Sequence, residues 1–310
     1  MMEEQKENKI MVSIISLAYN HVSYIRECLD GFMMQKTNFA FEVLIHDDAS
    51  TDGTADIIRE YEAKYPDIIK PIYQTENQYS KGIPIGCTYL YPRAKGKYIA
   101  LCEGDDYWTD PFKLQKQVDF LESHPDYVMC SHRFKQYIQD EHRFIKDWYT
   151  DETEDVVYDL ANLINGGWYH HPLSVLFRVS ALDLGEYNRY PKHMDAVLFF
   201  HLLKKGKGVM FNEDWAVYRI HKGGVWTMVG LNNQRKQEFQ ARLGICKVEQ
   251  SPEAAKFLLY QFKKFISRKW MIKEWRMMLR TFNAILSQLG FKLAFKVFFD
   301  KLVLSKVYDA

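Results

Sequence analysis

The sequence predicts an α/β protein with a Rossmann-like, mixed but mostly parallel sheet flanked by helices, followed by a helical C-terminal appendage. In the first half, short β-branched apolar runs alternate with segments whose apolar residues recur at helical spacing. Such alternation is typical of right-handed βαβ units, in which helices cover both faces of a parallel sheet. Beyond about residue 230, amphipathic helical periodicity takes over.

The expected elements follow one another along the chain. Strands are expected at residues 10–18, 41–45, 68–73 and 98–102, and helices between them at residues 22–35, 54–65 and 86–94. Asp110 and Pro111 suit the N-cap and first residue of another helix. Further strands are expected at residues 127–130, 173–177 and 215–220, and a helix at 194–204. Residues 134–160 have no clear period and are expected to form an insertion or loop.

Length and composition set the domain organisation. The 310 residues are 47% hydrophobic, which suits one large domain, residues 1–230, with halves at about 10–110 and 111–230, and a helical region at 231–310. The net charge of +1 does not favour nucleic acid as a partner. Five scattered cysteines, no secretory signal and no long apolar stretch predict a cytoplasmic protein with reduced thiols.

Carboxylates cluster directly after the strand expected at residues 98–102. Glu103, Asp105 and Asp106 follow that strand closely. Adjacent carboxylates repel one another unless a cation lies between them, and Mg²⁺ or Mn²⁺ is bound by one or two carboxylates together with phosphates and water. The cluster therefore suggests a metal–diphosphate site. A solvated acidic turn is the alternative.

Two more polar clusters follow the first and second expected strands, Tyr19-Asn20 and Asp47-Asp48. In open α/β sheets, ligands bind beyond the carboxyl ends of the strands, where the strand order switches. Polar clusters at three strand ends favour a ligand site over simple solvation of turns.

Ordered motifs run from residue 10 to about residue 225. They are Val12-Ser13-Ile14-Ile15 with Tyr19-Asn20, the run from Asp47 to Thr54, Asn77, Gly104-Asp105-Asp106, the run from Lys113 to Gln117, and the run from Val217 to Gly224. In this order they resemble the family 2 glycosyltransferases of the GT-A fold, especially bacterial enzymes of capsule, O-antigen and exopolysaccharide assembly. The resemblance implies an inverting, metal-dependent transfer of a sugar from a nucleotide diphosphate donor to a glycan hydroxyl.

The resemblance also implies which residues bind the nucleotide. Tyr19 would flank the nucleobase, Asp48 would accept the imide N–H of uracil, and Asp47 would lie near the ribose. Lys81 would pair with the base or a phosphate, with a solvated lysine as the alternative. UDP is therefore the favoured donor nucleotide, and dTDP stays open because thymine carries the same imide N–H.

For the metal, the resemblance implies that Asp106 is the main ligand of Mn²⁺ or Mg²⁺, while Asp105 contacts the ribose or the metal. His221 would be a further ligand or a phosphate contact, and a loop histidine that bonds the backbone is the alternative. The metal would stabilise the diphosphate leaving group as a Lewis acid. Glu103 stands where the family often has Asp, which leaves the number of ligands open.

Asp195, at the start of the helix expected at residues 194–204, lies where the family's catalytic acid usually lies, and is the implied general base. A helix N-terminus would keep it ionised. An ordinary N-terminal helix acid is the alternative. Residues 168–171, which are Trp-Tyr-His-His, are expected to form the floor of the acceptor site.

Other functions fit the sequence less well. A sugar-phosphate nucleotidyltransferase would carry a Gly-rich phosphate loop after the first strand, yet the first glycine is Gly31. A dinucleotide oxidoreductase would have G-x-G-x-x-G there. A non-catalytic sugar-binding or scaffold module would be expected to lack a carboxylate at one of positions 48, 105, 106 or 195, and all four are present.

The C-terminal tail is basic and aromatic. Residues 256–306 contain twelve Lys or Arg and two acids, Glu274 and Asp300, and Phe291, Phe295, Phe298 and Phe299 recur at helical spacing. Such helices can lie on an anionic membrane surface. The tail therefore suggests a protein peripheral to the inner face of the plasma membrane, with a lipid-linked oligosaccharide as acceptor. Packing on the catalytic domain or on a second subunit of a homo-oligomer is the alternative.

Overall fold

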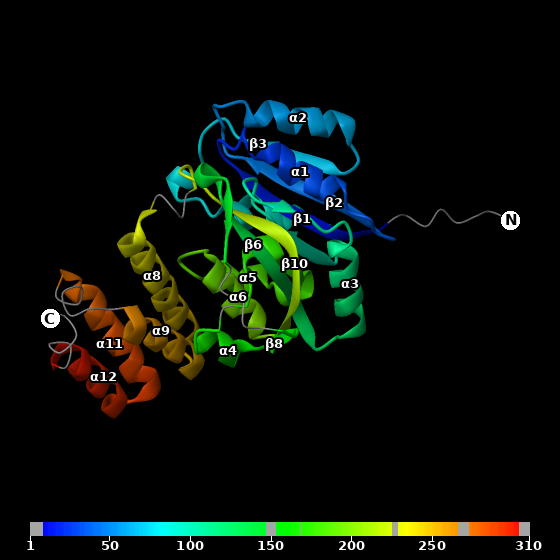
Figure 1. Ribbon diagram of the computed structural model, residues 1–310. Helices are drawn as coiled ribbons and strands as arrows, with labels where there is room; N and C mark the ends of the chain where they lie inside the picture. Colours follow the sequence, from blue (N-terminus) through cyan, green and yellow to red (C-terminus); the bar gives the residue numbers. More distant parts are fainter. Residues whose placement is uncertain (1–8, 147–152, 168, 225–228, 266–272, 304–310) are drawn as a thin grey trace. The chain divides into compact units, whose positions relative to one another are not determined.

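The computed structural model describes residues 9–146, 153–167, 169–224, 229–265 and 273–303 (Figure 1). It divides the chain into two units. The first comprises Met1–Tyr158, Tyr169–Leu184 and Leu202–Met228, and the second comprises Asp159–Trp168, Gly185–His201 and Val229–Ala310. The main division therefore falls at Val229, and two internal segments that the sequence assigned to the first domain belong to the second unit.

The first unit is built on a single mixed sheet. Its described strands are β1 (Ile10–Ala18), β2 (Ala40–Asp47), β3 (Ile69–Tyr73), β4 (Tyr98–Leu101), β5 (Tyr107–Trp108), β6 (Tyr127–Ile138), β7 (Arg143–Ile145), β8 (Val156–Tyr158), β9 (Leu176–Arg178) and β10 (Lys207–Ile220). The strand order is β3-β2-β1-β4-β9-β6-β10-β5, with β7 beside β6 and β8 beside β10. The Rossmann-like mixed sheet expected from the sequence is confirmed.

Parallel pairing dominates the half of the sheet that carries the polar clusters. Strands β3, β2, β1 and β4 are all parallel. In this register Ala18 of β1 lies opposite Asp47 of β2, and Ile15 of β1 lies opposite Leu101 of β4. The carboxyl ends of three neighbouring strands thus meet at one edge, as the sequence predicted. The other half is mixed, because β9 runs antiparallel to both β4 and β6.

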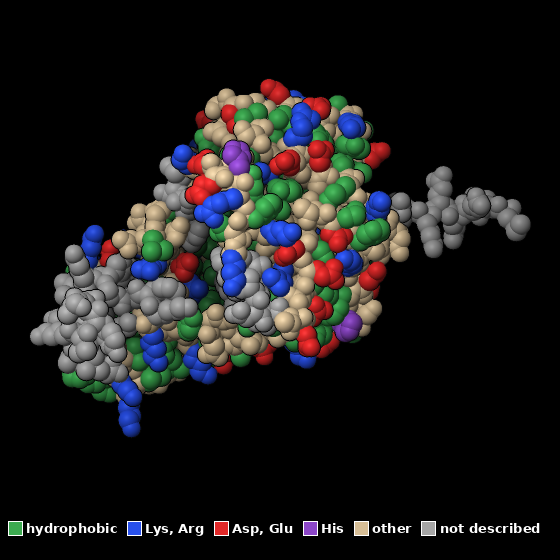
Figure 2. All heavy atoms as spheres, in the orientation of Figure 1, with side chains coloured by type: hydrophobic (Ala, Val, Ile, Leu, Met, Phe, Trp, Pro, Cys, Tyr) green, Lys and Arg blue, Asp and Glu red, His purple; other side chains and the backbone are tan. Residues whose placement is uncertain are grey.

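The helices of the first unit cover this sheet through their apolar faces. They are α1 (Ile25–Met33), α2 (Thr54–Lys64) and α3 (Lys113–Ser123). Helix α1 buries Ile25, Leu29 and Phe32, which share one face. Figure 1 shows α1 and α2 beside the strands β1 to β3. On the face shown in Figure 2, acidic and basic side chains are interspersed over this region, in keeping with the small net charge.

Several elements differ from those expected. Residues 86–94 form a π turn, Gly86–Leu90, and a 3-10 turn, Tyr91–Arg93, because Pro92 cannot donate the backbone hydrogen bond of an α-helix. Helix α3 begins at Lys113, since the Asp110 carboxylate accepts the N–H of Phe112 at 2.6 Å and forms a turn before the helix. The aperiodic stretch at 134–160 contains the end of β6 and the strands β7 and β8, and residues 147–152 lie outside the described part.

The second unit is helical. Its main helices are α4 (Leu160–Ile164), α5 (Leu184–Tyr187), the start of α6 (Asp195–Leu203), α8 (Leu231–Glu249), α9 (Pro252–Phe265), α11 (Trp275–Leu289) and α12 (Phe291–Val303). Phe200 and Phe257 stack in its core with ring centroids 5.6 Å apart. The helical C-terminal region is thus confirmed. Among the described helices, none combines the length and the apolar character needed to cross a membrane.

Candidate functional site

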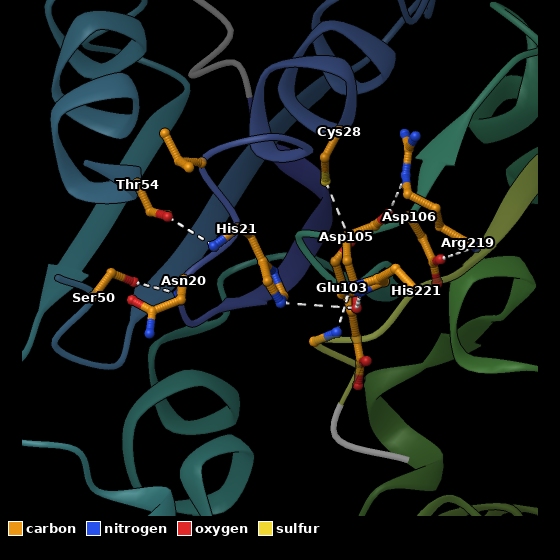
Figure 3. A network of polar contacts seen from close by, with 12 residues as sticks. Asn20, His21, Cys28, Ser50, Thr54, Glu103, Asp105, Asp106, Arg219 and His221 are labelled. Atoms are coloured by element: carbon orange, nitrogen blue, oxygen red, sulfur yellow. Dashed lines mark hydrogen bonds and ion pairs between the residues drawn. The ribbon is translucent and has the colours of Figure 1, made fainter. Parts of the chain in front are cut away.

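The turn after β1 is tied to the turn after β2. The backbone N–H of Asn20 donates to Ser50 Oγ at 2.9 Å, and the N–H of His21 donates to Thr54 Oγ1 at 2.8 Å (Figure 3). Asn20 has a positive φ of 56°, which bends the chain sharply at this point. Tyr19 is 42% exposed at the tip of the turn. Its phenol ring is therefore available to a planar ligand.

The paired carboxylates at the end of β2 have different environments. Both oxygens of Asp48 accept backbone N–H groups, from Gln78 at 2.7 Å and from Tyr79 at 3.0 Å. Asp47 Oδ2 accepts the N–H of Ser50 at 3.2 Å, whereas Asp47 Oδ1 is buried without a hydrogen-bond partner. A buried acceptor without a donor is costly. Asp47 Oδ1 therefore fits a ligand that brings an N–H or O–H group.

Lys81 belongs to the same loop but points to a different partner. It ends the 3-10 turn Tyr79–Lys81, and its ammonium forms an ion pair with the exposed carboxylate of Glu76. The structure thus assigns Lys81 a surface ion pair, in line with the alternative that the sequence left open. A role in binding the base or a phosphate stays a prediction.

The acidic loop after β4 directs Asp105 towards two histidines. Asp105 Oδ2 lies 3.1 Å from His221 Nε2 and 3.8 Å from His21 Nε2 (Figure 3). Burial alone would raise the pKa of Asp105, but the hydrogen bond with His221 and the proximity of the two histidines outweigh burial and lower it. Burial lowers the pKa of His21. Asp105 is therefore a stable carboxylate at neutral pH.

Asp106 faces the opposite way. Its side chain is 2% exposed, and its Oδ1 accepts the backbone N–H of Arg219 in β10 at 2.8 Å. Burial and the neighbouring Asp105 carboxylate raise its pKa well above the ordinary range. The negative charge of the pair is thus concentrated on Asp105. The resemblance implied that Asp106 is the main metal ligand, whereas its geometry suits holding the loop against β10.

The side chain of Arg219 holds the acidic loop from the same strand. Its Nε donates to the backbone oxygen of Asp105 at 2.8 Å, its Nη1 donates to Gln139 Oε1 at 2.9 Å, and its Nη2 forms an ion pair with Glu27. The guanidinium is almost fully buried. Arg219 therefore joins β10, α1, the acidic loop and the segment after β6.

Aromatic rings fill the space around this guanidinium. The rings of Tyr24 and Tyr107 lie 5.1 and 4.8 Å from it, and the Tyr24 ring lies 4.5 Å from that of His221. Sequence reasoning gave Arg219 no role, although a signal was present. Arg219 and His221 are two residues apart, at the end of β10 and just after it, so their side chains are expected to share a face. An arginine and a histidine at this spacing, where the strand ends, predict that both lie against the acidic loop.

Gly104 sets how closely the acidic loop approaches β1 and α1. A Cβ atom at this position would lie 3.0 Å from His21 Nδ1, from Ile25 Cδ1 and from the backbone oxygen of Leu17. Such contacts are tighter than ordinary van der Waals distances. A side chain at this position would therefore require its neighbours to shift by a few tenths of an ångström.

The donor set fits a hard divalent ion that is completed by a ligand. In the described residues, no group of three or more His, Cys, Asp or Glu side chains is arranged to hold a metal. Asp105 Oδ2 and His221 Nε2 share a hydrogen bond at 3.1 Å, and an ion would take the place of that proton, because adjacent ligands of an octahedral ion also lie about 3 Å apart when the bonds are about 2.1 Å long. The remaining ligands of such an ion would come from phosphate and water.

Asp195 is the first residue of α6, in the second unit. Its carboxyl is accessible to solvent, and the surrounding protein still desolvates it enough to raise its pKa to about 6. The expected effect of the helix N-terminus is therefore outweighed by desolvation. Above that pH the carboxylate form predominates, so the group can still accept a proton at neutral pH.

The segment expected to floor the acceptor site is only partly exposed. Trp168 lies outside the described residues. His170 is buried, and burial lowers its pKa to about 3, so it is a neutral core imidazole rather than a surface for a sugar. Tyr169 is half-buried, and its ring stacks on that of Tyr158 with centroids 5.9 Å apart.

Comparison with known proteins agrees with this geometry. The family model described as Glycosyl transferase family 2 matches residues 13–181. The chain belongs to this family. The Bacillus subtilis protein TuaG, described as a putative teichuronic acid biosynthesis glycosyltransferase, is 30% identical over 216 residues, which cover 68% of this chain and 80% of TuaG.

Two other relatives add detail. An uncharacterized Mycobacterium tuberculosis protein is 37% identical over 222 residues, which cover 69% of this chain, so the chain spans about 60% of the length of that relative. The Escherichia coli family 2 relative WfaP, described as a UDP-Glc:α-D-GlcNAc-diphosphoundecaprenol β-1,3-glucosyltransferase, is 36% identical over 113 residues, which cover 36% of this chain and 42% of WfaP.

Solved structures share the fold. The fragment 1–349 of S. aureus TarS in complex with UDP-GlcNAc has a TM-score of 0.66 at 18% identity, and the match covers 96% of this chain and 91% of that fragment. A Pyrobaculum calidifontis mannosyltransferase in complex with GDP-Man and Mn²⁺ has a TM-score of 0.52 at 17% identity, over 92% of this chain and 73% of that one. The expected GT-A fold is thus confirmed for this family 2 member.

Proposed function

We propose that this family 2 protein is an inverting, metal-dependent glycosyltransferase that takes a sugar from a uridine diphosphate donor. One observation carries the proposal. Asp47 Oδ1, which has no hydrogen-bond partner, lies at the end of β2, and Asp105 follows β4; these two strands flank β1 and run parallel to it. His221 follows β10 and reaches the Asp105 carboxylate at 3.1 Å. The end of this edge at Asp47 suits a nucleobase, and the end at Asp105 and His221 suits a diphosphate with its cation.

The nucleobase is assigned to the turns after β1 and β2. The exposed ring of Tyr19 would lie against the base, and Asp47 Oδ1 would accept the imide N–H of uracil. Asp48 stays a candidate for the same bond, although the loop N–H groups of Gln78 and Tyr79 already occupy both of its oxygens. Thymine carries the same imide group, so a dTDP-sugar is the competing donor.

The diphosphate is assigned to the acidic loop. Asp105 and His221 would hold Mn²⁺ or Mg²⁺ together with the phosphate oxygens, and Asp106 would fix the loop through Arg219. When bound, the ion supplies Lewis-acid stabilisation of the charge on the leaving diphosphate. His21 lies on the other side of Asp105 and would orient its carboxylate.

Asp195 is proposed as the general base. Its carboxylate would take the proton of the acceptor hydroxyl while that oxygen attacks the anomeric carbon. The bond from the anomeric carbon to the diphosphate oxygen breaks, the nucleoside diphosphate leaves, and the configuration at the carbon inverts. A pKa of about 6 leaves the group ionised at neutral pH yet basic enough to accept a proton.

The acceptor is proposed to be a glycan or lipid-linked oligosaccharide of bacterial surface polysaccharide synthesis. The description of TuaG refers to teichuronic acid and that of WfaP to a diphosphoundecaprenol acceptor. Such an acceptor would place the protein at the cytoplasmic face of the plasma membrane.

Calorimetric titration of the full chain with UDP, dTDP and GDP, each with and without Mn²⁺, tests this proposal. We expect Mn²⁺-dependent, micromolar binding of UDP and much weaker binding of GDP. Asp105→Asn is the matched variant, and it should lose the Mn²⁺ dependence. Failure of all three nucleotides to bind a folded sample would favour the non-catalytic sugar-binding or scaffold module instead.

A further inference from the structure

Helix α12 carries an exposed ladder of aromatic rings, which we call the Phe ladder: Phe291, Phe295 and Phe299. Their side chains are 64%, 52% and 48% exposed. They recur every four residues, so they lie along one face of the helix. Consecutive rings stack, with centroid separations of 5.7 Å in both pairs. The ladder is therefore a continuous apolar surface rather than three isolated side chains.

The other face of α12 is the one that folds the helical unit. Ala294 and Val297 are buried. Phe298 stacks on Phe262 of α9 at 4.5 Å and meets Phe282 of α11 edge-on at 5.2 Å. The helix thus has its own core contacts, and the Phe ladder is not needed for them. A contiguous exposed apolar surface of this kind marks an interaction site.

Positive charge accompanies the exposed apolar side chains. Lys292 and Lys296 are exposed, each directly after a ring of the ladder. Helix α11 repeats the pattern, because its exposed Trp275 and Leu279 are each followed by an exposed arginine. The two acids of the tail are Glu274 and Asp300, and Glu274 is paired with Lys236 at 2.8 Å. The described part of this surface is therefore both apolar and cationic.

We propose that the Phe ladder and its flanking lysines dock the protein on an anionic lipid bilayer surface. Aromatic rings enter the boundary between head groups and acyl chains, and lysine stems lie along apolar surface while their ammonium groups reach anionic head groups. Aromatic side chains and arginine also occur at protein interfaces, whereas lysine is depleted there, so the exposed lysine after each of two rings favours an anionic lipid surface. With 13 residues, α12 is about 20 Å long and lies on the bilayer rather than across it.

This inference deepens the proposed lipid-linked acceptor and rests partly on it. A bilayer-docked enzyme finds such an acceptor by diffusion in two dimensions. The two proposals can still fail separately, because binding to vesicles needs neither nucleotide nor metal. Conversely, UDP binding does not need the Phe ladder, which lies in the second unit.

Co-sedimentation of the full chain with vesicles tests the docking surface. One set of vesicles is phosphatidylcholine alone, and the other is an equal mixture of phosphatidylcholine and phosphatidylglycerol. The test variant is the triple change Phe291→Gln, Phe295→Gln and Phe299→Gln, since glutamine keeps helix propensity. The matched control changes Phe112 and Phe144 of the first unit to Gln, because they are 47% and 54% exposed.

We expect the wild type and the control pair to bind the anionic vesicles, and the triple variant to bind at least about tenfold more weakly. Lys292→Glu with Lys296→Glu should abolish the preference for phosphatidylglycerol. Far-ultraviolet circular dichroism and thermal unfolding report that each variant is folded. Equal binding by the triple variant, or no binding by the wild type, would overturn the proposal. Self-association of the wild type that the triple variant loses, without vesicle binding, would make the ladder an interface between copies of this chain.

Discussion

The backbone N–H of Arg219 donates to Oδ1 of Asp106 across 2.8 Å, and this bond fixes which of two adjacent carboxylates faces the ligand side of the loop. Because Asp106 is turned towards β10, Asp105 is turned towards His21 and His221. The two acids of the motif are therefore expected to have separable roles, Asp105 in binding and Asp106 in positioning.

Asparagine substitutions separate the two roles. Asp105→Asn removes the charge that the metal requires, and we expect kcat/KM to fall by at least about a hundredfold. Asp106→Asn keeps an oxygen for the Arg219 N–H and removes a charge that burial already disfavours, so we expect a loss within about tenfold. Steady-state rates across a range of Mn²⁺ concentrations measure both. A larger loss of kcat/KM for Asp106→Asn than for Asp105→Asn would indicate that Asp106 is the main metal ligand.

Arg219→Lys tests the positioning of the acidic loop. Lysine keeps the charge, but its single nitrogen replaces three guanidinium nitrogens, each of which reaches a different partner: Asp105, Gln139 or Glu27. We expect Mn²⁺ affinity to fall about tenfold while the far-ultraviolet circular dichroism is unchanged. Arg59→Lys is the control, because Arg59 is a surface residue that pairs with Asp56. Unchanged Mn²⁺ affinity would confine Arg219 to a packing role.

Asp47→Asn tests the nucleobase assignment. The asparagine side chain has one acceptor oxygen in place of two, so the Ser50 N–H and the uracil N–H would compete for it. We expect UDP affinity to fall about tenfold, which corresponds to about 1.4 kcal/mol, and inorganic diphosphate affinity to be unaffected. Calorimetry with both ligands checks this. An equal loss for diphosphate would show that the substitution disturbs the whole edge of the sheet.

The pKa of Asp195 sets the expected acid limb of the rate profile. A general base acts only when deprotonated, and desolvation by the surrounding protein raises the pKa of Asp195 to about 6. We therefore expect kcat/KM to fall about tenfold per pH unit below that value. Asp195→Asn should lower kcat while UDP affinity stays constant. A flat profile between pH values of about 5 and 7 would remove Asp195 from this role.

Lys113 offers a stability test that does not involve activity. Its ammonium is fully buried, lies 4.1 Å from the centroid of the Trp108 ring and donates to Gln117 Oε1 at 2.6 Å. Burial lowers its pKa to about 7, so above that pH the native state lacks a proton that the unfolded chain still binds. The difference between the free energies of unfolding of the wild type and of Lys113→Met should therefore shift in favour of the wild type as the pH rises.

The expected slope for Lys113 is about 1.4 kcal/mol per pH unit between pH values of about 7 and 10. Urea titrations of both proteins across this range measure the slope. The lost contacts of the methionine variant shift its stability by an offset that does not depend on pH. Lys95→Met, at an exposed position, is the control and should show no such slope. A pH-independent difference for Lys113 would contradict the lowered pKa.

The N-terminal half of the sheet could be predicted because its signals are local. The β-branched run of β1 and the polar residues after β1, β2 and β4 together specify three parallel strands with one functional edge. The order of the later strands could not be predicted. The short strand β9 owes its antiparallel place between β4 and β6 to partners that are distant in sequence, and no periodicity within three residues reveals such a place.

The site was predicted as a set of residues but not as a set of directions. The sequence places Asp105 and Asp106 in one loop, and only the contact with Arg219, more than a hundred residues away, decides which of them turns inward. The unpartnered oxygen of Asp47 is likewise a property of packing rather than of composition. Residue identity suggested the chemistry, and long-range contacts support the roles that we propose.

Gly104 contributes no functional group, yet it controls the spacing of those that do. An alanine Cβ at 104 would lie 3.0 Å from His21 Nδ1 and from the backbone oxygen of Leu17, so the loop and the turn after β1 would have to separate by a few tenths of an ångström. Asp105 Oδ2 and His21 Nε2 already lie 3.8 Å apart, and even a small separation would weaken that ion pair. Gly104→Ala would therefore alter the spacing of the site while it keeps every acid and imidazole.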